Sequence, residues 1–290
     1  MNPTSKIVLG TVQFGLNYGI NNTSGQVSEI EAFNILSYAK KQGIETLDTA
    51  HTYGNSEDVI GKFIQKSGEL FNLISKVPKL EEGKELNDYL KESLESLSAA
   101  NLYAYLFHDF DSYKSNPSLL LELIRLKHEG KIRKIGFSLY YPHELEYLLE
   151  QNIEFDIVQV PYSVFDQRFD KYFTELKKLG KEVHVRSVFL QGLVFKNPET
   201  LEGRFLSIKD KLAKLGDIAQ KSGLKISGLC LNFAVLNENI DKVVVGVDSL
   251  DNLEENVSDL SQIKITKKYY DKLKHLLVTD EQIILPINWK

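Results

Sequence analysis

The sequence has little cysteine, no excess of positive charge and no long apolar run. Cysteine occurs once, at Cys230, so the chain cannot form an internal disulfide, and a cytoplasmic protein is the default expectation. The formal net charge of −5 argues against a nucleic-acid partner, because a nucleic-acid-binding protein needs a basic patch. No apolar run can span a bilayer, and the start of the chain lacks the pattern of a secretion signal. We therefore expect no nucleic-acid partner and no membrane partner.

Several nucleotide and metal motifs are also missing. Gly10, Gly15 and Gly19 are wrongly spaced for the G-x-G-x-x-G fingerprint of dinucleotide-binding proteins, and no P-loop is present. The pair His143 and Glu144 is not followed by the second histidine of a zinc-binding helix. We predict that the protein binds no metal.

Strand-like apolar runs alternate with amphipathic helical patterns along the whole chain, and no Pro/Gly/Ser-rich linker divides them. This alternation predicts parallel strands joined by crossover helices in an α/β protein. The eight runs fit a closed (β/α)8 barrel, and 290 residues that are 42% hydrophobic can bury one such core. We predict a single barrel domain over residues 1–290, with strands near Ile7–Leu9, Ile44–Leu47, Phe71–Ser75, Leu102–Phe107, Ile132–Phe137, Phe155–Val160, Glu182–Arg186 and Lys242–Gly246.

Three segments are longer than such a barrel requires. Residues 11–27 follow the first predicted strand and residues 187–207 follow the seventh, so both lie on the C-terminal side of the barrel. Long connections on that side are candidates for ligand-binding loops. The third segment is the tail after Ser258, which carries the only tryptophan, Trp289.

Four polar side chains lie at the ends of three consecutive strand-like runs. Asp48 and Tyr53 follow the second run, Lys76 the third and His108 the fourth. In a barrel of neighbouring parallel strands, all four would meet at the C-terminal rim, where such barrels carry their chemistry. Taken singly, each has an ordinary structural role, such as a helix cap, a turn residue or a solvated strand end. Their occurrence at successive strand ends favours a catalytic cluster.

These four groups suit proton transfer to or from an oxygen atom. A free tyrosine has a pKa near ~10, and an ammonium close by lowers it by stabilising the phenolate. Asp48 would hold Lys76 charged, and His108 would donate a hydrogen bond to a carbonyl oxygen beside Tyr53. The cluster therefore fits the interconversion of a carbonyl and an alcohol. It contains no reductant, so a cofactor must bring the hydride.

The segment LDTAHTYGNSE, from Leu47 to Glu57, resembles the Asp/Tyr signature of the aldo-keto reductase superfamily. The segments ending at Lys76 and His108 are similar to its lysine and histidine elements, and the similarity runs from about Leu9 to about Asn256. The resemblance implies a (β/α)8 TIM barrel with a C-terminal tail over the barrel mouth.

The resemblance also implies roles for the four polar residues. Tyr53 is the expected general acid/base, Asp48 and Lys76 tune it, and His108 orients the carbonyl. The expected cofactor is NADP(H) or NAD(H), lying extended across the barrel mouth without a Rossmann domain. Trp289 would be either a lid over the substrate or an anchor for the tail.

The resemblance further implies a set of cofactor-binding residues that follows the extended dinucleotide from one end to the other. The nicotinamide would meet Gly10, Thr11, Ser138, Gln159 and Arg186, the pyrophosphate Ser187, Val188, Phe189, Leu190, Gln191 and Gly192, and the adenosine Gly246, Asp248, Ser249, Asn252, Glu255 and Asn256.

The sequence departs from the family pattern at several of these positions. Leu139 stands where an asparagine is usual, and Arg186 where many members stack an aromatic ring on the nicotinamide. Gly246 and Asn252 replace the lysine or arginine that binds the 2′-phosphate in many NADPH-selective members. Asp248 would repel that phosphate. Dual use of the cofactors or a preference for NADH is therefore our hypothesis.

The expected function is an oxidoreductase acting on a small carbonyl or alcohol, either as a monomer or as a small homo-oligomer. Tyrosine and asparagine in the predicted loops, such as Asn17, Tyr18 and Tyr113, suggest a hydroxyl-rich, sugar-like substrate. Two alternatives stay open: a cofactor-binding regulatory subunit on the same barrel, and a lyase or epimerase with the same four residues.

Overall fold

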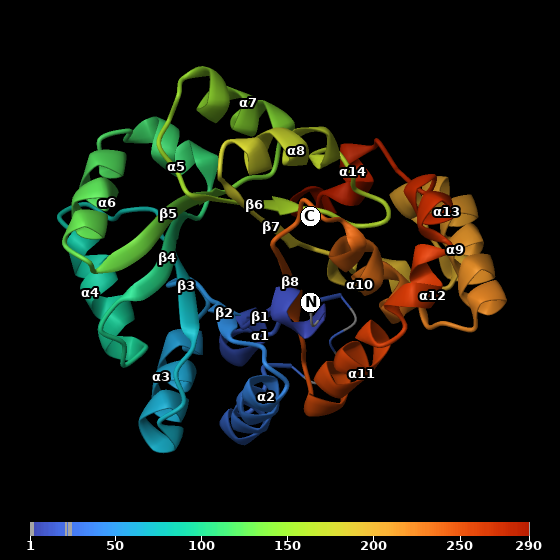
Figure 1. The fold of residues 1–290 in the computed structure, drawn as a ribbon, viewed down its shortest axis with the longest axis horizontal. Helices are drawn as coiled ribbons and strands as arrows, with labels where there is room; N and C mark the ends of the chain where they lie inside the picture. Colours follow the sequence, from blue (N-terminus) through green and yellow to red (C-terminus); the bar gives the residue numbers. More distant parts are fainter. Residues whose placement is uncertain (1–2, 21, 23–24, 290) are drawn as a thin grey trace.

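The computed structural model describes residues 3–20, 22 and 25–289, and its strands close into a barrel (Figure 1). Each strand pairs in parallel with its neighbour in sequence, and β8 pairs with β1 to close the ring. This confirms the predicted (β/α)8 barrel. The strands are β1 (Ile7–Gly10), β2 (Thr46–Asp48), β3 (Asn72–Val77), β4 (Leu102–Phe107), β5 (Ile132–Ser138), β6 (Ile157–Pro161), β7 (Glu182–Arg186) and β8 (Lys242–Gly246).

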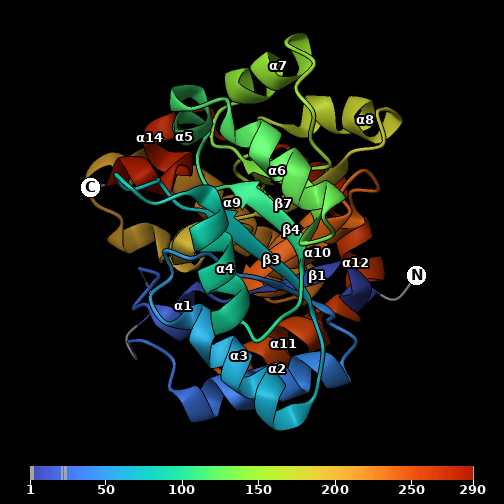
Figure 2. The same ribbon diagram turned by 90° about the vertical axis from the view of Figure 1, so that its left-hand side faces the viewer.

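Helices connect the strands and cover the outside of the barrel (Figure 2). The α-helices are α1 (Val12–Gly15), α2 (Glu29–Lys41), α3 (Ser56–Ser67), α4 (Leu86–Ser96), α5 (Phe110–Ser115), α6 (Leu119–His128), α7 (Pro142–Glu150), α8 (Asp170–Lys178), α9 (Lys209–Ser222), α10 (Ile226–Leu236), α11 (Leu250–Leu260), α12 (Ile263–Lys267), α13 (Tyr270–Lys274) and α14 (Glu281–Ile284). The 3-10 helices are η1 (Pro3–Lys6), η2 (Leu190–Phe195), η3 (Pro198–Thr200), η4 (Gly203–Ile208) and η5 (Pro286–Trp289).

Some predicted strands began too early. The second was expected from Ile44, but that residue belongs to the turn that closes α2. Its N–H donates to the carbonyl of Ala39 at 2.9 Å, and Gly43 before it has a φ of 78°. The third and sixth predicted strands likewise opened on Phe71 and Phe155, one and two residues before β3 and β6 begin. The apolar runs indicate which residues are buried. The chain becomes buried one or more residues before it adopts the extended conformation of the strand.

Other strands extend further than predicted at their carboxyl ends. Asp48 is the last residue of β2, and Lys76 lies within β3. Both side chains are therefore fixed by the barrel ladder rather than by a loop, which holds their positions more firmly.

Part of the barrel interior below the polar groups of the rim is apolar. Side chains alternate along a strand, so Ile74 lies on the same side of β3 as Lys76, and Ile157 on the same side of β6 as Gln159. Ile74 and Ile157 form a fully buried cluster with Ala104 and Leu106.

The C-terminal tail packs against neighbouring elements. The ring of Trp289 meets that of Phe205 in η4 edge-on, with centroids 5.2 Å apart. Its Nε1 donates to the carbonyl of Ile283 at 3.0 Å. Trp289 does not line the cavity described below. Of the two expected roles, its contacts match the anchor.

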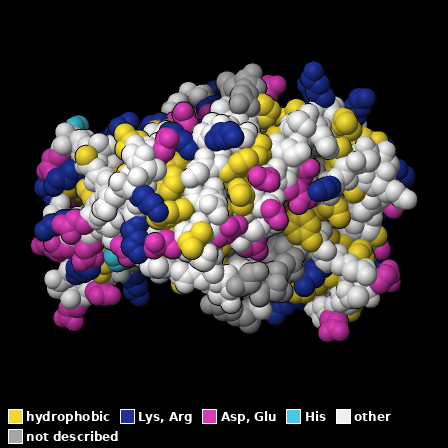
Figure 3. All heavy atoms as spheres, turned by 90° about the horizontal axis from the view of Figure 1, so that it is seen from below, with side chains coloured by type: hydrophobic (Ala, Val, Ile, Leu, Met, Phe, Trp, Pro, Cys, Tyr) yellow, Lys and Arg dark blue, Asp and Glu magenta, His cyan; other side chains and the backbone are white. Residues whose placement is uncertain are grey.

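Charged side chains of both signs are mixed on the face of the molecule shown in Figure 3, and no basic patch forms there. Within the described part of the chain, no helix is long and apolar enough to cross a membrane.

Candidate active site

A cavity of about 910 Å³ lies at the carboxyl ends of the strands. It brings together Asp48, Tyr53, Lys76 and His108, which come from β2, the loop after it, β3 and the end of β4. It also contains nearly all residues that the sequence predicted for the cofactor, namely Gly10, Thr11, Ser138, Gln159, Arg186, Ser187, Val188, Phe189, Gln191, Gly192, Gly246, Asp248, Ser249, Asn252, Glu255 and Asn256.

Leu190 is the exception among the predicted cofactor residues. Its side chain is fully buried in the hydrophobic core and does not line the cavity. The loop turns at this point, because Leu190 and Gln191 have φ angles of 44° and 51°. The prediction treated the segment as a continuous cofactor-facing run, whereas the turn directs this residue inward.

A buried ion pair lies at the centre of the site. The ammonium of Lys76 is 2.5 Å from Oδ1 of Asp48 and donates to the carbonyl of Thr49 at 2.8 Å. Burial disfavours the charged form of Lys76, but the charge of Asp48 and the interaction with Tyr53 outweigh burial and raise the pKa of Lys76. Lys76 is therefore a fixed positive charge at neutral pH.

Tyr53 lies next to this pair, with the Lys76 ammonium 5.1 Å from the centre of its ring. We expected Lys76 to bring the pKa of Tyr53 below its ordinary value. Burial instead raises the pKa of Tyr53, and the opposing effect of Lys76 is smaller. Removing water from the phenol disfavours the phenolate more than one paired ammonium favours it. Tyr53 is therefore protonated at neutral pH and able to donate its proton.

His108 faces Tyr53 edge-on, with ring centroids 5.8 Å apart. Burial, followed by the charge of Lys76, lowers the pKa of His108 to about 4, so its imidazole is neutral. The hydroxyl of Thr52 lies 3.3 Å from Nδ1 of His108. If that hydroxyl donates to Nδ1, the other ring nitrogen carries the proton and can donate to a ligand.

A tight contact between two glycines positions the Tyr53 loop. A Cβ on Gly15 would lie 1.7 Å from the backbone oxygen of Tyr53, and one on Gly54 would lie 2.4 Å from the backbone oxygen of Gly15. Gly54 also has a φ of 55°, which favours glycine. The local sequence around Gly15 contains no signal for this contact, because it depends on how closely two distant backbone segments approach.

The far end of the cavity carries a charged pair of which the sequence prediction included only Glu255. Lys225, at the start of α10, is 2.8 Å from the carboxylate of Glu255 in α11. Nearby, Ser227 donates to Asp259 at 2.7 Å. Lys225 and Ser227 line the cavity. Their position follows from how α10 packs beside α11, for which the local sequence has no signal.

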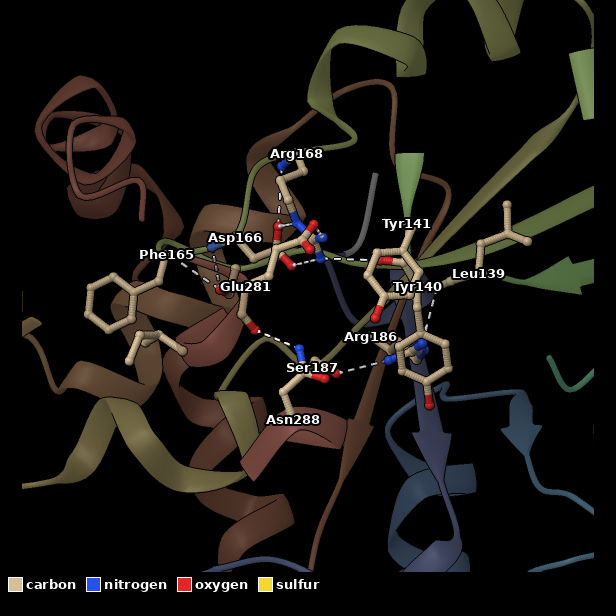
Figure 4. A network of polar contacts seen from close by, with 12 residues as sticks. Leu139, Tyr140, Tyr141, Phe165, Asp166, Arg168, Arg186, Ser187, Glu281 and Asn288 are labelled. Atoms are coloured by element: carbon tan, nitrogen blue, oxygen red, sulfur yellow. Dashed lines mark hydrogen bonds and ion pairs between the residues drawn. The ribbon is translucent and has the colours of Figure 1, made fainter. Parts of the chain in front are cut away.

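At the opposite end, Arg186 stacks on an aromatic ring. Its guanidinium carbon lies 4.3 Å from the centre of the Tyr140 ring, and one NH2 group donates to the carbonyl of Leu139 at 3.1 Å. Figure 4 shows Tyr140 connected in turn to Arg168, which donates to its carbonyl at 3.2 Å and also binds Glu281 of α14. The tail therefore supports this side of the cavity through Arg168.

Eight parallel strands with a lysine–aspartate pair, a phenol and an imidazole at their carboxyl ends define a barrel enzyme of the oxidoreductase class. The chain belongs to the aldo/keto reductase family, whose model matches residues 6–278. Members of this family generally use nicotinamide cofactors.

Two curated relatives carry names of oxidoreductases. L-galactose dehydrogenase of Arabidopsis thaliana is 26% identical over 276 residues, covering 88% of this chain and 86% of that protein. Glyoxal reductase of Bacillus subtilis (strain 168) is 39% identical over 127 residues, covering 41% of this chain and 44% of that protein. These names support oxidoreductase activity.

A solved structure, the holo form of the aldo-keto reductase AKR11C1 from Bacillus halodurans, superposes with a TM-score of 0.76. It is 23% identical and covers 96% of this chain and 95% of that chain. At this identity the likeness supports the fold alone.

Proposed function

We propose that this protein is an NAD(P)H-dependent oxidoreductase that interconverts a carbonyl compound and an alcohol, with Tyr53 as the general acid/base. The observation that carries this proposal is the buried pair of Lys76 and Asp48, 2.5 Å apart, beside a protonated phenol and a neutral imidazole. Tyr53 gives its proton to the carbonyl oxygen in reduction and recovers it in oxidation. His108 donates a hydrogen bond to the same oxygen, and Lys76 stabilises the phenolate that forms.

The cavity has features that fit an extended dinucleotide. The absence of a side chain at Gly246 lets Gln13 lie close to the backbone there, since a Cβ would be 2.8 Å from the Gln13 amide. The Oε1 atom of Gln13 is buried without a hydrogen-bond partner, so a polar ligand group would satisfy it. Between the two ends, Ser187 and Gln191 have φ angles of 64° and 51°, a backbone form that can turn successive N–H groups towards phosphate oxygens.

A nicotinamide bound near Tyr53 would supply the hydride. Residues at the other end of the cavity would hold the adenosine of the same cofactor. The residues that would surround the adenosine are Asp248, Asn252, Glu255 and Lys225. Lys225 is the only lysine or arginine among them, and Glu255 already neutralises it at 2.8 Å. We therefore infer that the protein uses NADH at least as well as NADPH. Comparison of the two dissociation constants by fluorescence quenching tests this, and NADPH binding about a hundredfold tighter would contradict it.

Names of relatives point to aldehydes and sugars as the substrate class. One relative is named for L-galactose and another for glyoxal. Tyr18 and Tyr140 line the cavity on the Arg186 side and present hydroxyl groups that suit a hydroxylated carbonyl compound. Tyr113, which lies in α5, does not line the cavity, because its side chain is buried against Phe107.

The experiment that tests this proposal removes the hydroxyl oxygen of Tyr53. Tyr53→Phe deletes the proton donor and keeps the ring, so we expect turnover to fall about a hundred- to ten-thousandfold while cofactor affinity is nearly unchanged. Tyr269→Phe is the matched control, because that hydroxyl lies outside the cavity and donates to the carbonyl of Lys221. Wild-type rates in Tyr53→Phe on a good substrate would rule out the proposed role of Tyr53.

A further inference from the structure

One cation on the cavity wall lacks an anionic partner. Among the residues that the structure describes, the lysines and arginines lining the cavity are Lys76, Arg186 and Lys225. Lys76 is paired with Asp48 at 2.5 Å, and Lys225 with Glu255 at 2.8 Å. Arg186 forms no salt bridge within the described ranges. A half-buried guanidinium without a counter-charge is an anion-binding group by default.

The geometry of Arg186 leaves donors free for a ligand. A guanidinium has five N–H donors. One donates to the hydroxyl of Ser187 at 3.3 Å and another to the carbonyl of Leu139 at 3.1 Å. The ring of Tyr140 holds the group flat from one side. The guanidinium is thus fixed in orientation, and its remaining donors have no partner among the described residues.

Arg186 acts on the end of the cavity where the reaction is proposed to occur. Burial has the largest influence on the pKa values of Tyr53, Tyr18 and His108, raising the first two and lowering the third, and the charge of Arg186 acts to lower all three. The carboxylate nearest these groups is Asp48, which Lys76 already neutralises. The potential at this end is therefore positive, and a negatively charged ligand group would be attracted to it.

Given the proposed carbonyl chemistry, on which this inference rests, we propose that the physiological substrate carries an anionic group, a carboxylate or a phosphate. The guanidinium of Arg186 binds that group while the carbonyl lies between Tyr53 and His108. Arg186 is then the residue that determines substrate charge, in addition to any contact that it makes with the nicotinamide.

The experiment compares substrate pairs that differ only in charge. Suitable pairs are succinic semialdehyde with its methyl ester, and glyceraldehyde 3-phosphate with glyceraldehyde, so that the two arms separate carboxylate from phosphate. In the wild type we expect kcat/KM to favour the anionic member of at least one pair about tenfold or more. Arg186→Met should reduce that preference about tenfold to a hundredfold, and Arg186→Lys should retain part of it.

Two controls separate substrate charge from cofactor binding. Lys225→Met removes another cation from the same cavity and should leave the anionic-to-neutral ratio unchanged. Calorimetric titration of 4-hydroxybutanoate, the product of the first pair, into the NADH-loaded protein measures binding without turnover, because an alcohol and a reduced cofactor cannot react. We expect its dissociation constant to rise about tenfold in Arg186→Met.

The outcomes distinguish this inference from the proposed function. Equal kcat/KM for both members of each pair in the wild type would overturn the anionic substrate and leave carbonyl reduction standing. In Arg186→Met, an unchanged ratio of kcat/KM between anionic and neutral substrates, together with weakened cofactor binding, would show that the guanidinium binds the cofactor. That result would also overturn the proposal of an anionic substrate. Failure to reduce any carbonyl with either cofactor would instead remove the proposed function itself.

Discussion

Gln159 donates its side-chain amide to Oδ2 of Asp48 at 2.7 Å, while Lys76 contacts the other oxygen of the same carboxylate. The family resemblance assigned Gln159 to the nicotinamide carboxamide. Its contact in this structure is with Asp48, so it fixes the orientation of the ion pair beside Tyr53. All three side chains are buried.

Replacing Gln159 by leucine should therefore destabilise the fold as well as the site. The buried Oδ2 atom of Asp48 would lose its donor, and an unsatisfied buried acceptor costs about 1–3 kcal/mol. Urea unfolding at neutral pH measures the loss. Gln65→Leu is the control, because that exposed side chain contacts only Ser98, and its replacement should stay within about 0.5 kcal/mol. Equal stability of the two variants would mean that the Gln159 contact contributes nothing.

Gly15→Ala should impair the proposed chemistry without changing any polar residue. The new Cβ would lie 1.7 Å from the backbone oxygen of Tyr53, so the two backbones must separate. We expect a loss of about 1–3 kcal/mol in stability from overpacking, and a displaced phenol should lower kcat about a hundredfold. Gly216→Ala is the matched control, since a Cβ there meets nothing within 4 Å and alanine favours its helix. Unaltered kcat in Gly15→Ala would show that the Tyr53 loop has another support.

The pH dependence of carbonyl reduction should be flat through the neutral range. Burial raises the pKa of Tyr53, so the phenol keeps its proton until the solution is more alkaline than about pH 10. Burial lowers the pKa of His108 to about 4, so its imidazole stays neutral above about pH 5. Profiles of kcat/KM at constant ionic strength measure both limits. An inflection near pH 6.5, lost in His108→Gln, would show that His108 titrates in its ordinary range.

The barrel and the grouping of Asp48, Tyr53, Lys76 and His108 could be anticipated because both follow from local pattern. Alternating apolar runs determine strand order, and strand ends in a parallel barrel meet at one rim. The direction in which the pKa of Tyr53 shifts could not be anticipated, because it depends on how much water the folded protein removes from the phenol. The Gly15–Gly54 contact and Lys225 were missed for a related reason. They depend on backbone approach and helix packing between segments far apart in sequence, which periodicity does not encode.

Lys225 also leads to a prediction about cofactor choice. In the wild type its ammonium is held by Glu255 at 2.8 Å, and Asp248 adds a second negative charge to the same part of the cavity. Glu255→Gln would remove the competing carboxylate and leave Lys225 free to bind a 2′-phosphate. A charge-assisted hydrogen bond from Lys225 to the 2′-phosphate then becomes available, so the affinity for NADPH should rise severalfold relative to NADH.

Glu254→Gln is the matched control for this change, because Glu254 is an exposed neighbour on the same helix that does not line the cavity. It removes the same formal charge from the protein, so any general electrostatic effect on a dinucleotide would be shared by both variants. Only a local effect through Lys225 would give the two variants different preferences for NADPH over NADH. Raising the salt concentration should reduce that difference, because Lys225 is largely exposed. If the ratio of NADPH to NADH dissociation constants is the same in both variants, Lys225 does not reach the cofactor and the adenosine lies elsewhere along the cavity.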